Sequence, residues 1–115
     1  MKVLNVELNF DFADADDLER FEKEYPETEK ILQEIKWDNA KASETIRSFC
    51  KVIFEFFDKV FGEGTAEKVF KGKSNYQTCL KAFKDVVDEK DKQDNEVDET
   101  IHYLENYSPD RAKRD

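Results

Sequence analysis

The chain has 115 residues, which suffices for one domain whose core needs neither a disulfide nor a metal ion. Its formal net charge of −9 argues against binding to nucleic acid or to an anionic membrane surface. The sequence contains no apolar run near the ~20 residues that span a bilayer, and its first ten residues lack the apolar core of a signal peptide. We therefore expect a cytoplasmic protein that neither contains a membrane segment nor binds a cofactor.

The charges are unevenly distributed along the chain. Residues 1–39 carry 12 acidic and 5 basic side chains, whereas residues 40–84 carry 5 acidic and 9 basic ones. Residues 85–115 are acidic again, with 11 acidic and 5 basic side chains. The basic centre is able to attract an acidic partner or the acidic flanks of its own chain, and we favour the second interpretation.

Residues 3–12 alternate between apolar and polar side chains, which predicts a half-buried strand. The apolar face consists of Leu4, Val6, Leu8, Phe10 and Phe12. A single strand needs a pairing partner. The segment is therefore expected to fold as a hairpin, to pair with another subunit, or to lie over the helices.

Four aspartates surround the predicted start of the first helix, namely Asp11, Asp14, Asp16 and Asp17. Their spacing invites comparison with a calcium loop, but the glycine that such a loop needs at its sharp turn is missing. We interpret Asp14 as the N-cap, followed by acids that suit the positive end of the helix dipole.

Pro26 is expected to end or kink this helix near Tyr25 and to begin a second helical piece. The inner face of that piece is predicted to contain Ile31, Leu32, Ile35 and Trp37.

The central helix is predicted over residues 43–61, with Ser43 as its cap and Gly62 as a left-handed stop. Thr65 is expected to cap a short helix that ends at Gly72. Ser74 and Gln77 then have the spacing of a capping box for the last long helix. Its buried stripe is predicted to contain Tyr76, Leu80, Phe83 and Val87.

Residues 88–96 are almost wholly charged and fit either a solvated helix or a loop. Val97, Ile101 and Leu104 resume helical spacing, which would allow them to pack back on the domain. We predict a mainly α fold, a small domain of three to five helices with one N-terminal strand or hairpin. The predicted parts are a domain over residues 1–87, an acidic helical extension over 88–107 and a disordered tail over 108–115.

No catalytic, cofactor-binding or metal-ligating residue is predicted. Cys50 and Cys79 lie among apolar residues at helical spacing, which predicts two free, buried thiols in a reducing compartment. His102 has no identifiable nucleophile or orienting partner. The Gly62-Glu63-Gly64 segment lacks the strand and the further glycines of a phosphate loop, so we interpret it as a turn.

The central helix carries more apolar residues than one packed face requires. Ten of the sixteen residues from Ile46 to Phe61 are apolar, whereas a single stripe suffices for a small domain. The surplus predicts a partner-binding patch. Its residues are Val52, Phe54, Phe56 and Lys59. Alternatively, the strand and the helix near Ile31 cover the surplus.

The centre of the sequence resembles a family of small proteins of about this length that phages and prophages of Gram-positive bacteria encode. The resemblance covers residues 3–87. It rests on Phe56, Phe57, Asp58, Phe61, Gly62, Glu63, Gly64, Thr65, Phe70, Gly72, Cys79, Ala82 and Phe83.

The resemblance implies a role in tail morphogenesis, similar to that of small tail assembly chaperones, which bind the tape measure protein and are absent from the finished virion. It supplies no catalytic residue. We therefore expect a non-enzymatic, homo-oligomeric protein that binds a tail protein in the bacterial cytoplasm and binds no nucleic acid. The alternatives are an acidic regulatory decoy, such as a DNA mimic, and a virion structural subunit.

Overall fold

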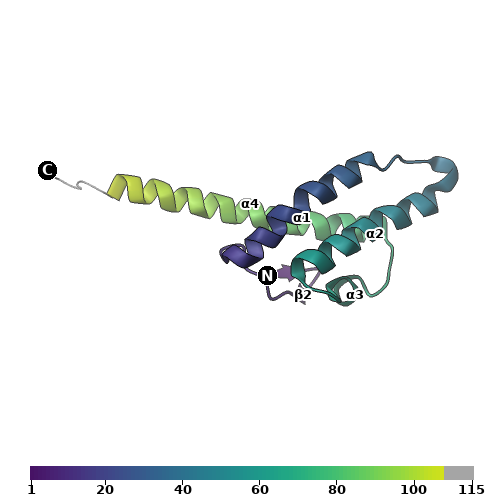
Figure 1. The fold of residues 1–115 in the computed structure, drawn as a ribbon, viewed down its shortest axis with the longest axis horizontal. Coiled ribbons are helices and arrows are strands. Elements are labelled where there is room, and N and C mark those ends of the chain that lie inside the picture. Colours follow the sequence, from purple (N-terminus) through teal and green to yellow (C-terminus); the bar gives the residue numbers. More distant parts are fainter. Residues whose placement is uncertain (108–115) are drawn as a thin grey trace.

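The computed structural model describes residues 1–107, which form a short hairpin and four α-helices (Figure 1). The strands are β1 (Lys2–Val3) and β2 (Val6–Glu7). The helices are α1 (Ala15–Glu34), α2 (Ala42–Phe61), α3 (Thr65–Phe70) and α4 (Tyr76–Tyr107), and a 3₁₀ turn (Asn39–Lys41) precedes α2. These elements confirm the predicted fold class. The predicted disordered tail lies outside the described residues.

Of the predicted alternatives for the N-terminal segment, the structure contains the hairpin, with two residues in each strand. β1 and β2 are antiparallel, with Val3 opposite Val6. Leu4 and Asn5 join them with φ values of 50° and 65°, the conformation of a two-residue turn that matches strand twist. Beyond β2 the chain leaves the ladder and buries Phe10 and Phe12 among the helices, so the predicted apolar alternation does mark buried positions.

Helix α1 continues through Pro26, contrary to the predicted break. Proline removes one backbone hydrogen bond, but Glu22, whose carbonyl loses that bond, is exposed to water. Phe21 and Tyr25 before the proline and Thr28 after it are packed on the domain. Packing on both sides of Pro26 therefore holds the helix together. Beyond this point the predicted inner face is only partly buried, because Ile31 and Trp37 are exposed.

The predicted caps of α2 and α4 are shifted by one or more residues. Asp38 caps the 3₁₀ turn by accepting a hydrogen bond from the Ala40 amide at 2.9 Å, and α2 follows directly without a Ser43 cap. Asn75, rather than Ser74, caps α4 by accepting from the Thr78 amide at 2.9 Å. In each case the preceding loop places this polar side chain next to the first backbone amides of the helix, which have no acceptor within the helix.

The turn between α2 and α3 uses two glycines differently. Gly62 has φ 116° and ψ 147°, a positive but extended conformation rather than the predicted left-handed one, which Gly64 adopts instead. Thr65 lies inside α3, where its hydroxyl donates to the Gly62 carbonyl at 2.6 Å. The carboxylate of Asp58 in α2 takes the capping role and accepts from the Ala66 amide at 2.8 Å.

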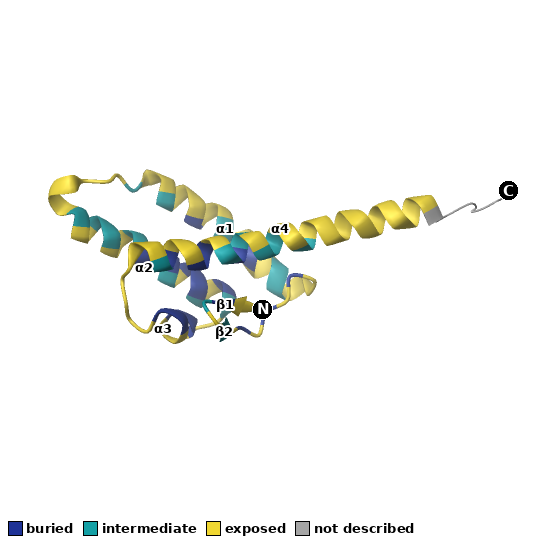
Figure 2. Ribbon diagram, turned by 180° about the vertical axis from the view of Figure 1, so that it is seen from behind, coloured by how far each residue is buried: buried dark blue, intermediate teal, exposed yellow. Residues whose placement is uncertain are grey.

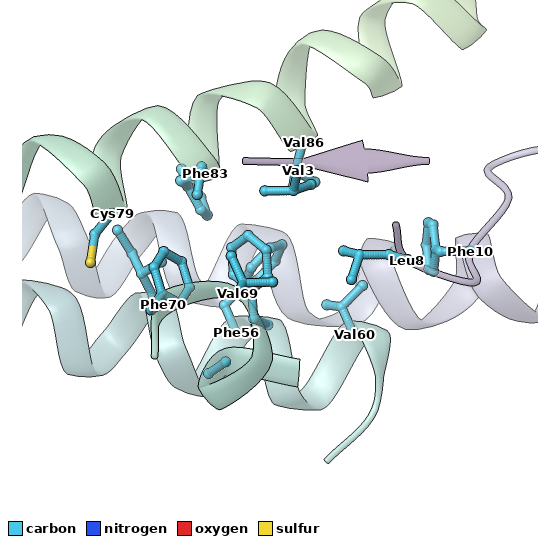
Figure 3. Close-up of a cluster of buried hydrophobic side chains, with 14 of the residues drawn as sticks. Val3, Leu8, Phe10, Phe56, Val60, Val69, Phe70, Cys79, Phe83 and Val86 are labelled. Atoms are coloured by element: carbon cyan, nitrogen blue, oxygen red, sulfur yellow. The ribbon is translucent and has the colours of Figure 1, made fainter. Parts of the chain in front are cut away.

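Helix α2 contacts each of the other three helices and carries the largest share of the core (Figure 3). Phe56 and Phe57 are both essentially inaccessible to water. The buried hydrophobic residues are Val3, Leu8, Phe10, Phe12, Phe21, Cys50, Ile53, Phe56, Phe57, Val60, Ala66, Val69, Phe70, Cys79, Ala82, Phe83 and Val86.

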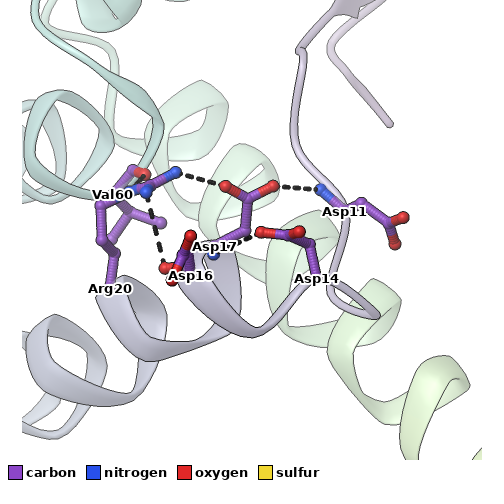
Figure 4. A network of polar contacts seen from close by, with 6 residues as sticks. All are labelled: Asp11, Asp14, Asp16, Asp17, Arg20 and Val60. Carbon is purple, nitrogen blue, oxygen red and sulfur yellow. Dashed lines mark hydrogen bonds and ion pairs between the residues drawn. The ribbon is translucent and has the colours of Figure 1, made fainter.

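A polar network joins the chain before α1 to the end of α2 (Figure 4). The Arg20 guanidinium donates to the Val60 carbonyl at 2.9 Å and to the Asp17 carboxylate at 2.6 Å. Asp17 also accepts from the Asp11 amide at 3.0 Å, and Asp14 caps α1 by accepting from the Asp17 amide at 3.1 Å, which confirms the predicted cap. The aspartates therefore stabilise helix ends.

Only the first part of α4 belongs to the core (Figure 2). Its buried residues are Cys79, Ala82, Phe83 and Val86, whereas Tyr76 and Leu80 of the predicted stripe are exposed. The helix continues without interruption past residue 88, and we call residues 88–107 the arm. Every side chain from Asp94 to Asn106 is exposed, so Val97, Ile101 and Leu104 do not pack back on the domain.

Replacing Gly62 with valine is expected to lower the free energy of unfolding by more than ~1 kcal/mol, because a β-branched residue tolerates positive φ poorly. The added Cβ would meet its nearest neighbour, the Thr65 hydroxyl, only at 4.0 Å, so the cost lies in the backbone. Chemical denaturation measures the change. Glu63→Val, at an exposed neighbouring residue outside the positive-φ set, is the matched control. An unchanged Gly62→Val midpoint would contradict this assignment.

Backbone amides of residues 94–106 are expected to exchange hydrogen at least about tenfold faster than those of residues 46–83 in dilute protein at high salt. The arm lacks packing there, and isolated helices of this length are marginal in water. Exchange followed by mass spectrometry tests this expectation. Equal protection of the two segments would mean that the arm is part of the domain.

Candidate protein-binding surfaces

The predicted patch on α2 is only partly open. Phe56 is buried, with 1% of its surface exposed, so its predicted place in a partner-binding patch is wrong. Its ring contacts Phe21 and Tyr25 of α1 and Phe83 of α4, with centroids 6.1, 6.4 and 5.1 Å away. Helices α1 and α4 therefore cover the apolar surplus on this side of α2.

The other predicted patch residues are not gathered into one apolar surface. Phe54 is half-buried because its ring lies 4.8 Å from that of Phe70 in α3. Val52 is half-buried and Lys59 is exposed. Partner binding by Val52, Phe54 and Lys59 stays a prediction.

The arm carries an exposed apolar stripe. Val97, Ile101 and Leu104 are 43%, 49% and 56% exposed and follow one another at helical spacing. Each lies 18 residues, or about five helical turns, after a residue of the buried stripe formed by Cys79, Phe83 and Val86. The arm stripe therefore continues the line along which α4 packs on its own domain.

A groove lies where the arm leaves the domain, between α1 and α4. Its volume is about 340 Å³, and its apolar part is formed by Phe21, Tyr25, Pro26 and Val87. Glu22, Lys90, Asp91 and Asp94 line the rest. Burial, followed by the hydrogen bond that Tyr25 donates to Glu29 at 3.0 Å, raises the pKa of the Tyr25 hydroxyl.

The arm is strongly acidic. Residues 88–107 include eight acidic side chains and two lysines. Lys90 forms an ion pair with Asp94 at 2.6 Å, which leaves most of the carboxylates without a cation on the arm itself. An apolar stripe flanked by carboxylates suits a helical segment that carries apolar residues on one face and lysine or arginine beside them.

The thiols of Cys50 and Cys79 are free and buried, as predicted. Burial, together with hydrogen bonding to the neighbouring Cys50 thiol, raises the pKa of Cys79 to about 12. The thiol is therefore protonated at neutral pH and is not a nucleophile.

Within residues 1–107, no group of three or more His, Cys, Asp or Glu side chains is arranged to hold a metal ion. His102 is exposed, and its ring lies 3.1 Å from the Asn106 amide nitrogen. No helix in this part of the chain has the length and apolar character needed to cross a membrane.

Cys50 and Cys79 are expected to react slowly with a thiol reagent in the native protein and to yield two thiols after denaturation. Stability should also fall as the pH rises from about 9 toward about 12, because the unfolded thiol loses its proton before the buried Cys79 does. Cys79→Ala should make that fall shallower. Recovery of no thiols without a reductant would show a disulfide and contradict this expectation.

The comparisons with known proteins identify one family. No curated protein and no solved structure matches the chain at a significant level. A family of unknown function, DUF6673, matches residues 4–115, which include the arm as well as the domain. The chain therefore belongs to the DUF6673 family.

Proposed function

We propose that this protein is a non-enzymatic binding protein whose arm captures a helical segment of a client, as a tail assembly chaperone captures a tape measure protein. The choice of client rests on the resemblance to small proteins of phages and prophages. The exposed stripe of Val97, Ile101 and Leu104 carries the binding part of the proposal.

The stripe supports helix capture because it resembles the face with which α4 packs on its domain, but it lies outside the core. In the domain, Phe83 and Val86 at the equivalent positions are covered by other elements. In the arm, the same kind of surface meets water. A helix packed along the stripe would bury its three apolar side chains. Full burial of one such side chain contributes about 1.5–3 kcal/mol to binding. The contribution here is smaller, because each side chain is already partly shielded from water.

The groove beside Tyr25 and Val87 extends this surface toward the domain. A client helix longer than the stripe would place its next apolar residue there. The nearby carboxylates of Glu22, Asp91 and Asp94 favour a client with basic residues flanking its apolar face.

An acidic decoy that mimics DNA is a second candidate, and the eight carboxylates of the arm favour it. The groove with which a DNA-binding protein contacts the phosphate backbone is basic. Exposed Ile101 and Leu104 would not contribute to binding in such a groove. The apolar stripe therefore favours a protein client over mimicry.

The test is co-expression of the full chain with the tape measure protein of the same genome, followed by affinity measurement on the purified pair. Ile101→Glu should weaken capture at least about tenfold, because it places a charge in the apolar contact. Asn95→Glu adds the same charge to an exposed position on another side of the helix and should leave capture unchanged.

Three outcomes would contradict the proposal. If neither variant alters capture, the stripe is not the binding surface. If the protein binds no tape measure protein but blocks a DNA-binding protein, the decoy is correct. If the protein is recovered in purified virions, it is a structural subunit.

A further inference from the structure

An open aromatic hollow lies at the end of the domain opposite the arm. It is formed where the end of α1 and the following loop meet α2 and the start of α4, and its volume is about 180 Å³. The loop between α1 and α2 and the free end of the arm lie at opposite ends of the molecule (Figure 1). The hollow is lined by Leu32, Ile35, Trp37, Thr45, Phe49 and Tyr76.

The aromatic rings of the hollow pack on one another but stay open to water. The Tyr76 ring lies 4.7 Å from that of Phe49 and 6.1 Å from that of Trp37. The indole nitrogen of Trp37 donates to the Asn39 side chain at 2.7 Å, which fixes the orientation of the ring. Trp37 is nevertheless 54% exposed, more than any other large hydrophobic residue in residues 1–87. An exposed tryptophan held beside a preformed hollow is typical of a binding hot spot.

Basic side chains predominate around this end of the domain. Arg47 and Lys73 are exposed and line a second hollow beside the start of α4. Residues 68–84 contain five lysines and no acidic residue, and residues 30–51 contain five basic and three acidic ones. The aromatic hollow is therefore an apolar surface in a positively charged setting, which suits an apolar segment that carries carboxylates.

The free end of the arm has these complementary properties. Residues 94–107 contain five acidic residues and neither lysine nor arginine. Asp98 and Glu105 directly follow Val97 and Leu104, so both carboxylates flank the exposed stripe on the same side of the helix.

The arm cannot reach the hollow of its own domain. Helix α4 runs without interruption from Tyr76 to Tyr107, and Val97 lies 21 residues, or about 31 Å, beyond Tyr76. The arm also extends away from the other helices (Figure 2). The attraction expected between the basic centre and the acidic flanks of its own chain therefore cannot be satisfied by the arm within one copy.

We propose that the arm of one copy binds the aromatic hollow of a second copy, head to tail. Ile101 and Leu104 would enter the hollow against the exposed part of Trp37, and the carboxylates beside them would face Arg47 and Lys73. The packing of the aromatic rings on one another stays intact. Because the two surfaces lie at opposite ends of the molecule, each added copy presents a free arm or a free hollow, so copies assemble in a row.

This inference goes beyond the client proposed above and does not depend on it. A client would compete with the second copy for the arm. Substitutions in the hollow separate the two proposals, because they leave the stripe of Val97, Ile101 and Leu104 unchanged. Trp37→Glu should therefore weaken self-association and leave client capture intact.

Sedimentation velocity of the full chain at low ionic strength tests the contact. The mean mass of the wild type should rise with concentration beyond that of a dimer. Trp37→Glu and Ile101→Glu each place a carboxylate in the apolar contact and should weaken association at least about tenfold. Ala15→Glu adds the same charge at an exposed residue at the other end of α1 and should have little effect.

An equimolar mixture of the two variants gives the sharpest test. The Trp37→Glu copy keeps an intact arm and the Ile101→Glu copy keeps an intact hollow, so one contact can form between them. The mixture should recover the affinity of a single wild-type contact and stop at a 1:1 complex. Raising the salt concentration from about 50 to about 500 mM should weaken this complex, because it screens the flanking charges.

Four results would overturn the proposal. A wild type that stays monomeric at about 0.5 mM would exclude the contact, since a dissociation constant above about 1 mM corresponds to a weak one. Association that survives Trp37→Glu would place the contact elsewhere, for example between two arms. A mixture that associates no better than either variant alone, or that grows beyond a 1:1 complex, would exclude head-to-tail pairing.

Circular dichroism checks that the variants fold, which is expected because each substituted side chain is exposed. Should Trp37→Glu lose helix, Arg47→Glu replaces it in the same assay, because Arg47 is an exposed residue on the same basic end. It should weaken association and form the same 1:1 complex with Ile101→Glu, and wild-type association of Arg47→Glu would contradict the proposed charge pairing.

Discussion

The ring of Phe56 lies among aromatic rings from three helices, and this packing determines how the rest of the chain is used. Tyr25 stacks 5.7 Å from Phe83, and both also contact Phe56. Helix α2 is apolar on most of its circumference, so α1, α3 and the start of α4 are all needed to cover it. Within residues 1–107, none of these elements covers the side chains of residues 94–106. The arm is exposed because the elements that pack on α2 do not extend over it.

The local sequence predicts the elements better than it predicts their partners. The alternation of residues 3–12, the cap at Asp14 and the burial of both cysteines are visible in the sequence because they depend on near neighbours. Pro26 was expected to break α1, but tertiary packing of Tyr25 and Thr28 outweighs the local preference. The shift from Ser74 to Asn75 as the cap of α4 is set by the path of the preceding loop, which composition does not specify.

Phe56 was wrongly placed in the candidate site for a related reason. Counting apolar residues on the helix of Phe56 identifies a surplus, but not which other helices cover it. The signal for the arm was present, since Val97, Ile101 and Leu104 have helical spacing. The sequence places them in an extension that has the spacing to pack back on the domain, and helical spacing alone does not decide whether it does so. Only the uninterrupted course of α4 places these residues beyond the reach of the domain.

The length of α4 is therefore the feature that most requires a functional explanation. The apolar residues of this helix pack on the core only as far as Val87, yet the helix continues for about five to six further turns. Ion pairs such as Lys90–Asp94 contribute only a few tenths of a kcal/mol to an exposed helix. The acids toward its end reduce its stability, because they face the negative end of the dipole. A helical partner with basic residues would remove both costs by covering the stripe and neutralising the carboxylates.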